Sequence, residues 1–168
     1  IMPYALKRCA DILRGSTVKA STTIGFPHGG HTTAIKRAEA ERAIADGCEE
    51  LDMVVNISQV LSGRWDYVRD DVRAVIDVAH AADQKVKVIF ENCFLRDEHK
   101  IRLCEICGEL NADWVKTSTG YGTGGAGGSG EHGGLTDKFP GMSTQDLISY
   151  LKKSKYHSVL SNSYLLPI

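Results

Sequence analysis

The sequence lacks the features that mark several classes of protein. Its 168 residues contain no apolar run near the roughly 20 residues that span a bilayer, so we expect no transmembrane segment and no membrane partner. It also lacks an excess of one charge, because 20 basic and 21 acidic residues give a formal net charge of −1. We therefore expect no nucleic-acid partner. With 42% hydrophobic and 24% charged residues, the composition is typical of a soluble globular protein rather than of a disordered chain.

A disulfide framework is missing as well. The five cysteines are an odd number without regular spacing, which predicts reduced thiols and a cytoplasmic location. Cys104 and Cys107 form a C-x-x-C pair, but no second such pair and no histidine pair completes a zinc site. We therefore predict buried thiols and no metal.

Strand-like and helix-like patterns alternate along the chain. Short apolar or β-branched runs predict four strands, at residues 18–24, 51–55, 86–90 and 114–116. Apolar residues at helical spacing predict three helices between them, at residues 33–46, 68–79 and 97–110. Thr32 or Thr33 is the expected cap of the first helix and Asp97 that of the third. A further helix is predicted near residues 144–151.

The strands recur about every 30 residues, which is the length of a β-α-β unit. The pattern therefore predicts an α/β fold with a parallel sheet and right-handed crossovers.

Charged residues interrupt these apolar strands. They are Lys19, Asp52, Lys87, Glu91 and Lys116. Burying an unpaired charge is costly, so such residues usually pair with one another or serve a site. Lysines and carboxylates that converge at the carboxyl ends of parallel strands favour amine chemistry, since a lysine that loses its proton can attack a carbonyl and form a Schiff base. The alternative is a layer of structural salt bridges.

The segment Lys-Thr-Ser-Thr-Gly at residues 116–120 is the most specific local motif. It places a lysine at a strand end, then three hydroxyl groups, then a glycine that lets the backbone approach a ligand. The alternative is a polar turn. Gly120, Gly122 and Gly125 also match a dinucleotide-binding fingerprint, but more glycines follow where a helix should begin. We therefore predict no nicotinamide cofactor.

Several motifs together resemble those of the deoxyribose-phosphate aldolases. Besides the segment at 116–120, they are Ile-Gly-Phe-Pro-His-Gly at 24–29, Glu-Leu-Asp-Met-Val at 50–54 and Val-Lys-Val-Ile-Phe-Glu at 86–91. Their order and spacing agree over residues 3–126. The resemblance implies reversible cleavage of 2-deoxyribose 5-phosphate, a small phosphosugar, into acetaldehyde and glyceraldehyde 3-phosphate, without a metal or an organic cofactor.

The resemblance also implies roles for single residues. Lys116 resembles the lysine that forms the Schiff base, Asp52 the carboxylate that shuttles protons, and Lys87 a lysine that lines the pocket. The residues expected to bind the substrate are Thr117, Thr119 and Gly120.

The family fold is a (β/α)₈ TIM barrel of ~250 residues. By resemblance, residues 1–126 form a partial barrel with strands three to six, and residues 127–168 form a glycine-rich loop and a divergent tail. A second family lysine, in the pattern Lys-x-Ala/Ser-Gly-Gly, has no counterpart here. Open sheet edges would favour a homo-oligomer. The alternative interpretation is therefore a catalytically silent barrel fragment that acts, if at all, through self-association.

Overall fold

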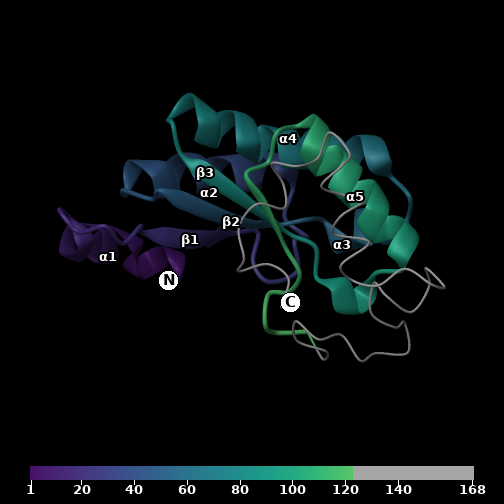
Figure 1. Cartoon of the computed structure of the whole chain (residues 1–168), viewed down its shortest axis with the longest axis horizontal. Coiled ribbons are helices and arrows are strands. Elements are labelled where there is room, and N and C mark those ends of the chain that lie inside the picture. The colour runs from purple at the N-terminus through teal and green to yellow at the C-terminus, as the bar shows by residue number, and fades with distance from the viewer. Residues whose placement is uncertain (123–168) are drawn as a thin grey trace.

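Four parallel strands form the centre of the fold in the computed structural model, which describes residues 1–122 (Figure 1). The strands are β1 (Ser21–Ile24), β2 (Glu50–Val54), β3 (Lys85–Ile89) and β4 (Trp114–Lys116). They lie in the order β1-β2-β3-β4, and each pairs in parallel with the next. The predicted parallel α/β sheet is confirmed.

Helices connect the strands in the alternation that the sequence predicts. The main helices are α2 (Thr33–Ala45), α4 (Trp65–Ala81) and α5 (Asp97–Glu109), and all three lie on one side of the sheet in Figure 1. Two short helices were not predicted, α1 (Leu6–Leu13) and α3 (Ile57–Leu61). The five residues of α3 are too few to show a helical period.

The two faces of the sheet differ in chemistry because successive side chains of a strand point to opposite faces. In β2, Leu51 and Met53 are fully buried and alternate with Asp52. In β3, Val86 and Val88 are fully buried and alternate with Lys87. One face therefore packs into the hydrophobic core beneath the helices, and the other carries the charged residues.

A buried ion pair joins two helices to the sheet. Lys36 of α2 donates hydrogen bonds to Asp71 of α4 at 2.5 Å and to the carbonyl of Val54 at 2.8 Å, and both charged side chains have no exposed surface. Burial lowers the pKa of Lys36, and the Asp71 carboxylate opposes this shift. Gly25 makes room for the lysine, because a Cβ atom there would lie 2.7 Å from Lys36 Cε.

Two local expectations were wrong, and a third was right in position but not in its hydrogen bond. Lys19 precedes β1 and pairs with Glu49 at 2.5 Å on the surface, so it is not a buried strand residue. Thr32 is the N-cap residue of α2, as one of the two alternatives predicts, but its side chain makes no capping hydrogen bond, and the hydroxyl of Thr33, the first helical residue, donates to Asp71 at 2.9 Å. Asp97 is the first residue of α5 rather than its cap, and it pairs with Lys100 at 3.0 Å. The charged partners of Lys19 and Thr33 are 30 and 38 residues away in the sequence, so no local pattern reveals them.

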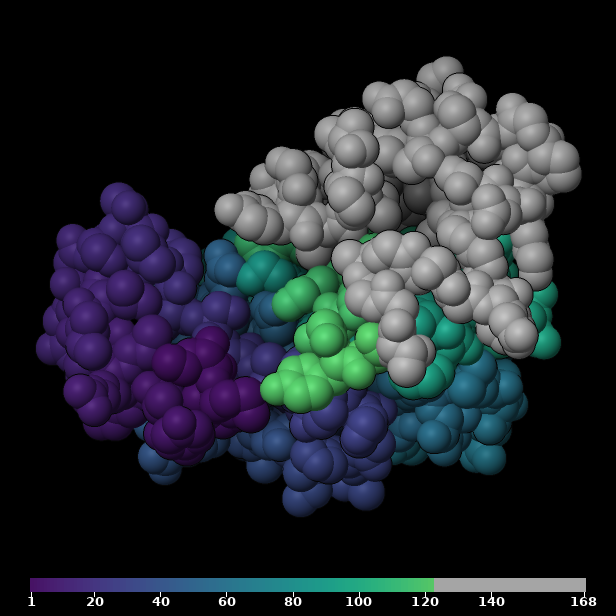
Figure 2. All heavy atoms as spheres, turned by 90° about the horizontal axis from the view of Figure 1, so that it is seen from below, coloured from purple at the N-terminus to yellow at the C-terminus, as the bar shows by residue number. Residues whose placement is uncertain are grey.

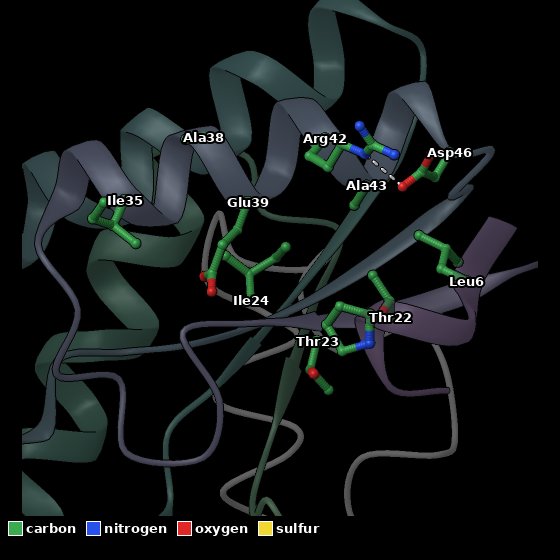
Figure 3. Close-up of a pocket in the computed structure, with 11 residues that line it drawn as sticks. Leu6, Thr22, Thr23, Ile24, Ile35, Ala38, Glu39, Arg42, Ala43 and Asp46 are labelled. Atoms are coloured by element: carbon green, nitrogen blue, oxygen red, sulfur yellow. Dashed lines mark hydrogen bonds and ion pairs between the residues drawn. The ribbon is translucent and has the colours of Figure 1, made fainter.

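A groove of about 270 Å³ lies between β1 and α2 (Figure 3). Its walls include Thr22, Ile24, Ile35 and Ala43, and they contain none of the lysines of the sheet.

Within residues 1–122, no helix is long and apolar enough to cross a bilayer. The predicted helix at 144–151 and the proposed boundary between residues 126 and 127 lie outside the described residues.

Asp113 holds the start of β3 in place, and its carboxylate should make the free energy of unfolding depend on pH. Its carboxylate accepts hydrogen bonds from the Val86 amide at 3.0 Å and contacts His80 and Lys85 at 3.0 and 2.9 Å. Burial raises the pKa of Asp113, but these partners outweigh it and hold the pKa below 3.8. The stabilisation is therefore complete above pH 4–5 and is lost as pH falls through the lower folded-state pKa.

We expect Asp113→Asn to lower the free energy of unfolding by about 1 kcal/mol at pH 7, with the difference from wild type vanishing in acid. Urea unfolding between pH 2 and pH 7 measures this. Asp70→Asn is the matched control, because within residues 1–122 the Asp70 carboxylate makes a single, exposed ion pair, with Arg73 at 3.3 Å. A pH-independent difference for Asp113→Asn would show that its charge is not involved.

Candidate active site

Asp52 is the centre of the charged face. It lies in the middle of β2, and only 7% of its surface is exposed. One carboxylate oxygen, Oδ2, accepts a hydrogen bond from Lys116 Nζ at 2.8 Å. The other, Oδ1, accepts from Lys87 Nζ at 3.2 Å and from the Ser21 hydroxyl at 3.4 Å. One carboxylate therefore binds two lysines from two different strands.

Lys87 is held as a cation. It lies opposite Asp52 in the β2–β3 register and also donates to Glu50, while its ammonium lies 5.2 Å from the centre of the Trp114 ring. Burial lowers the pKa of Lys87, but hydrogen bonds and charge attraction from Glu50 and Asp52 outweigh this and raise the pKa above its ordinary value. At neutral pH Lys87 is thus an ammonium ion and a poor nucleophile.

Lys116 ends β4 and is the more accessible of the two lysines. Its side chain is 35% exposed, compared with 17% for Lys87. Within residues 1–122 its ammonium has one carboxylate partner, Asp52, whereas Lys87 has two. Of the two lysines, Lys116 therefore offers the larger surface to an incoming carbonyl compound.

The loop that follows Lys116 is fastened to the end of β3. The backbone amides of Phe90 and Asn92 donate to the carbonyls of Lys116 and Thr117 at 2.9 and 2.8 Å. Glu91, between them, accepts hydrogen bonds from the Ser118 hydroxyl at 2.7 Å and from both the amide and the hydroxyl of Thr119. The hydroxyl-rich segment is thus bound to the sheet next to the lysine.

The predicted substrate-binding residues differ in what they offer. Gly120 is exposed and has a φ of +84°, which favours glycine. A Cβ atom at Gly120 would meet no other atom of residues 1–122 within 4 Å, so its backbone can be approached. The Thr119 hydroxyl, in contrast, already donates to Glu91. Thr117 is half-buried beside Lys116.

The loops after β1 and β4 meet beside this site. The rings of Phe26 and Tyr121 make an edge-to-face contact with centroids 5.4 Å apart. In Figure 2 the green surface near residue 120 borders the purple and blue surface of the first third of the chain. The aromatic pair therefore links the outermost strands of the sheet at their carboxyl ends.

Sequence reasoning missed three polar residues on the charged face. Glu50 binds Lys87, and Ser21 donates to Asp52. Thr23 lies opposite Asp52 in the β1–β2 register, and its buried hydroxyl has no hydrogen-bond partner within the described residues. Glu50 lies two residues before Asp52 in the same strand, and this spacing could have indicated that both side chains point to the same face. No local pattern indicates that Ser21 and Thr23, on the neighbouring strand, also lie on that face.

The arrangement suits amine chemistry. An amine and a carboxylate 2.8 Å apart can exchange a proton directly, since general acid–base catalysis operates at about 2.6–3.2 Å. Loss of the proton leaves Lys116 able to attack a carbonyl carbon, while the Lys87 ammonium keeps a positive charge beside the reacting atoms.

The thiols and other potential metal ligands offer no second site in the part of the chain that the structure describes. Cys107 is fully buried, and burial raises its pKa well above the ordinary value, so the thiol stays protonated. Within residues 1–122, no group of three or more His, Cys, Asp or Glu side chains could hold a metal ion.

Comparisons with known proteins agree on one family. The model of the DeoC/LacD family aldolases matches residues 4–146. The chain is 77% identical over 126 residues to a deoxyribose-phosphate aldolase of Rhodopirellula baltica, covering 75% of this chain and 52% of that protein. It is 48% identical over 128 residues to a deoxyribose-phosphate aldolase of Thermococcus kodakarensis, covering 75% and 57%. The chain thus spans about half the length of the curated relatives it matches.

A solved structure shares the arrangement of strands and helices. The tetrameric deoxyribose phosphate aldolase from Aeropyrum pernix superimposes with a TM-score of 0.67 at 30% identity, covering 74% of this chain and 52% of that one. The four-stranded parallel sheet is therefore similar to part of a TIM barrel.

Proposed function

The chain belongs to the DeoC/LacD family of aldolases, and on that basis we propose that it acts as a deoxyribose-phosphate aldolase of the Schiff-base type. The reaction is the reversible cleavage of 2-deoxy-D-ribose 5-phosphate to acetaldehyde and D-glyceraldehyde 3-phosphate. The observation that carries the proposal is the Asp52 carboxylate bound by both Lys116 and Lys87. The names of the curated relatives support it over the alternative of a catalytically silent fragment.

In the proposed mechanism, Lys116 gives its proton to Asp52 and attacks the C1 aldehyde carbon of the open-chain sugar. Loss of water then forms an iminium ion. In that dehydration Asp52 returns its proton to the departing hydroxyl group. The bond between C2 and C3 then breaks as the 3-hydroxyl loses its proton to the Asp52 carboxylate. C3 becomes the aldehyde carbon of D-glyceraldehyde 3-phosphate, which leaves, and the electron pair of the broken bond moves into the iminium to give an enamine. Reprotonation at C2 and hydrolysis release acetaldehyde and restore Lys116.

Other residues of the site assist these steps. The Lys87 ammonium, held by Glu50, stabilises negative charge on Asp52 and on the substrate oxygens. The loop residues Thr117, Thr119 and Gly120 position the phosphosugar, Gly120 through its exposed backbone. The iminium itself accepts the electron pair, so the proposal includes no metal or organic cofactor. It places the reaction in the cytoplasm, in the catabolism of deoxyribonucleotides and other carbohydrates.

Reductive trapping tests this proposal. The chain is incubated with 2-deoxyribose 5-phosphate and sodium borohydride, which reduces an iminium to a stable secondary amine, and the adduct is located by mass spectrometry. We expect it on Lys116. An adduct on Lys87 or Lys19 with Lys116 unmodified would refute the assignment, and the absence of any substrate-dependent adduct would refute the proposed function.

We also propose that the chain self-associates and turns over slowly. Within residues 1–122, β1 and β4 each pair with one neighbouring strand, which leaves two sheet edges open to another chain. The Aeropyrum pernix relative is described as a tetramer. The side chain of Lys116 is 35% exposed, and the second lysine expected from the family pattern has no counterpart in the sequence, so the site encloses the reacting amine incompletely and lacks one of the expected groups.

We therefore expect light scattering to give a mass above the 18.3 kDa of one chain, together with cleavage well below a typical enzyme rate of ~10 s⁻¹. A stable 18.3 kDa species would contradict self-association, and turnover near the typical rate would contradict slow catalysis.

A further inference from the structure

We propose that Glu91 is a positioning residue, whose buried carboxylate fixes the loop after Lys116 in the conformation that the reaction requires. This inference rests on the proposed function, since it concerns the same lysine. Glu91 itself does not contact the amine, and it acts through Ser118 and Thr119.

The contacts of Glu91 concentrate on this loop. Its Oε1 accepts from the Ser118 hydroxyl at 2.7 Å, and its Oε2 accepts from the Thr119 amide at 3.0 Å and from the Thr119 hydroxyl. The same two hydroxyl oxygens then accept from the amides of Gly120 at 3.0 Å and Tyr121 at 3.1 Å. One carboxylate thereby orders the backbone of four consecutive residues, 118–121.

The environment of Glu91 is unusual for a structural carboxylate. The residue is only 2% exposed, yet within residues 1–122 no cationic nitrogen lies within 4.0 Å of it, so the loop supplies its principal hydrogen bonds. Its φ of +56° is a conformation that non-glycine residues rarely adopt. A buried charge and a strained backbone both cost free energy, and such costs concentrate at functional sites.

The loop encloses the carboxylate tightly. A Cβ atom at Gly122 would lie 3.0 Å from Glu91 Oε1 and 2.5 Å from Cys93 Sγ, so a side chain at this position would force a shift. Because Lys116 directly precedes the loop, a change in the turn moves both the amine and the backbone at Gly120. Displacements of about 1 Å at a reacting centre can lower a rate by ~10²-fold.

Three variants test the inference. Glu91→Gln keeps the size of the side chain but presents an amide NH₂ to the loop donors, and Thr119→Val removes one of those donors. Thr119→Ser keeps the hydroxyl. With 2-deoxyribose 5-phosphate and borohydride, we expect the maximal rate of adduct formation on Lys116 to fall ~10²-fold in Glu91→Gln and in Thr119→Val. Thr119→Ser retains the donor that Glu91 accepts from, so it should recover most of the rate that Thr119→Val loses.

The double variant and an exchange measurement separate positioning from stability. If Glu91 acts through Thr119, Glu91→Gln with Thr119→Val should be no slower than the slower single variant, within about threefold. Amide hydrogen exchange in the peptide covering 117–121 should accelerate in Glu91→Gln. Asp113→Asn, a variant outside the site that lowers stability, should form the adduct at the wild-type rate.

The outcomes distinguish the two proposals. Glu91→Gln with wild-type adduct formation, or with unchanged exchange in residues 117–121, would overturn the positioning role. A wild-type chain that forms no adduct on Lys116 would refute the proposed function instead, and the exchange measurement would then still decide whether Glu91 orders the loop.

Discussion

Lys116→Arg should abolish imine formation and lower aldol cleavage by about 10⁴- to 10⁶-fold, the scale seen when an enzyme loses its nucleophile. Arginine keeps the positive charge and can still donate to Asp52, so the ion pair at 2.8 Å is retained in kind. The guanidinium, however, does not lose its proton in proteins and cannot attack a carbonyl. The measurements are borohydride trapping and the rate of acetaldehyde release.

Lys19→Arg is the matched control for this substitution. Lys19 pairs with Glu49 on the surface, outside the charged face of the sheet, so trapping and cleavage should both be unchanged. If Lys116→Arg retained a substrate-dependent adduct, another lysine would be the nucleophile, and the role proposed for Lys116 would be wrong.

Asp52→Asn should lower the rate of adduct formation by ~10²–10⁴-fold, which is the usual contribution of general acid–base catalysis. The amide oxygen can still accept a hydrogen bond, but it cannot take a proton from Lys116. The variant also removes a charge that raises the pKa of Lys87. Pre-steady-state trapping with 2-deoxyribose 5-phosphate measures the rate, and circular dichroism checks that the fold is kept.

Glu50→Gln shows whether the slower adduct formation in Asp52→Asn results from the lost proton acceptor or from the lost negative charge beside Lys87. Glu50 binds the same Lys87 ammonium as Asp52 does, but within residues 1–122 it makes no ion pair with Lys116. We expect it to slow adduct formation less than tenfold, in line with the weakening of one partly exposed ion pair. Equal losses in Glu50→Gln and Asp52→Asn would assign both carboxylates to charge balance, and an unchanged rate in Asp52→Asn would reduce Asp52 to a structural partner.

The strand and helix order could be read from the sequence because local patterns carry it. Apolar runs such as 51–55 and 86–90 lie within one residue of the observed β2 and β3, and the spacing between them is that of a β-α-β unit. Charged residues inside these apolar runs, such as Asp52 and Lys87, were therefore recognisable as unusual for buried strands. Lys19 looked like another charged residue of this kind, but it lies before its strand, because β1 begins only at Ser21.

The partners of these charges could not be read in the same way. Lys116 and Asp52 are 64 residues apart, and Lys87 and Glu50 are 37 residues apart, so their contacts depend on strand order, register and side-chain rotamers together. Motif resemblance indicated that Thr119 binds substrate, but it did not indicate that the Thr119 hydroxyl donates to Glu91. Sequence periodicity does not indicate a contact of this kind, which joins a residue at the end of β3 to the loop that follows β4.

The sequence alone determined the α/β class, the parallel sheet and a short set of charged candidate residues, because these depend on side-chain periodicity and composition. Which lysine is accessible and which is held between two carboxylates followed from the fold. The reason is physical: the protonation and reactivity of an amine depend on burial and on the charges within a few ångströms, and folding brings those neighbours together from distant parts of the chain.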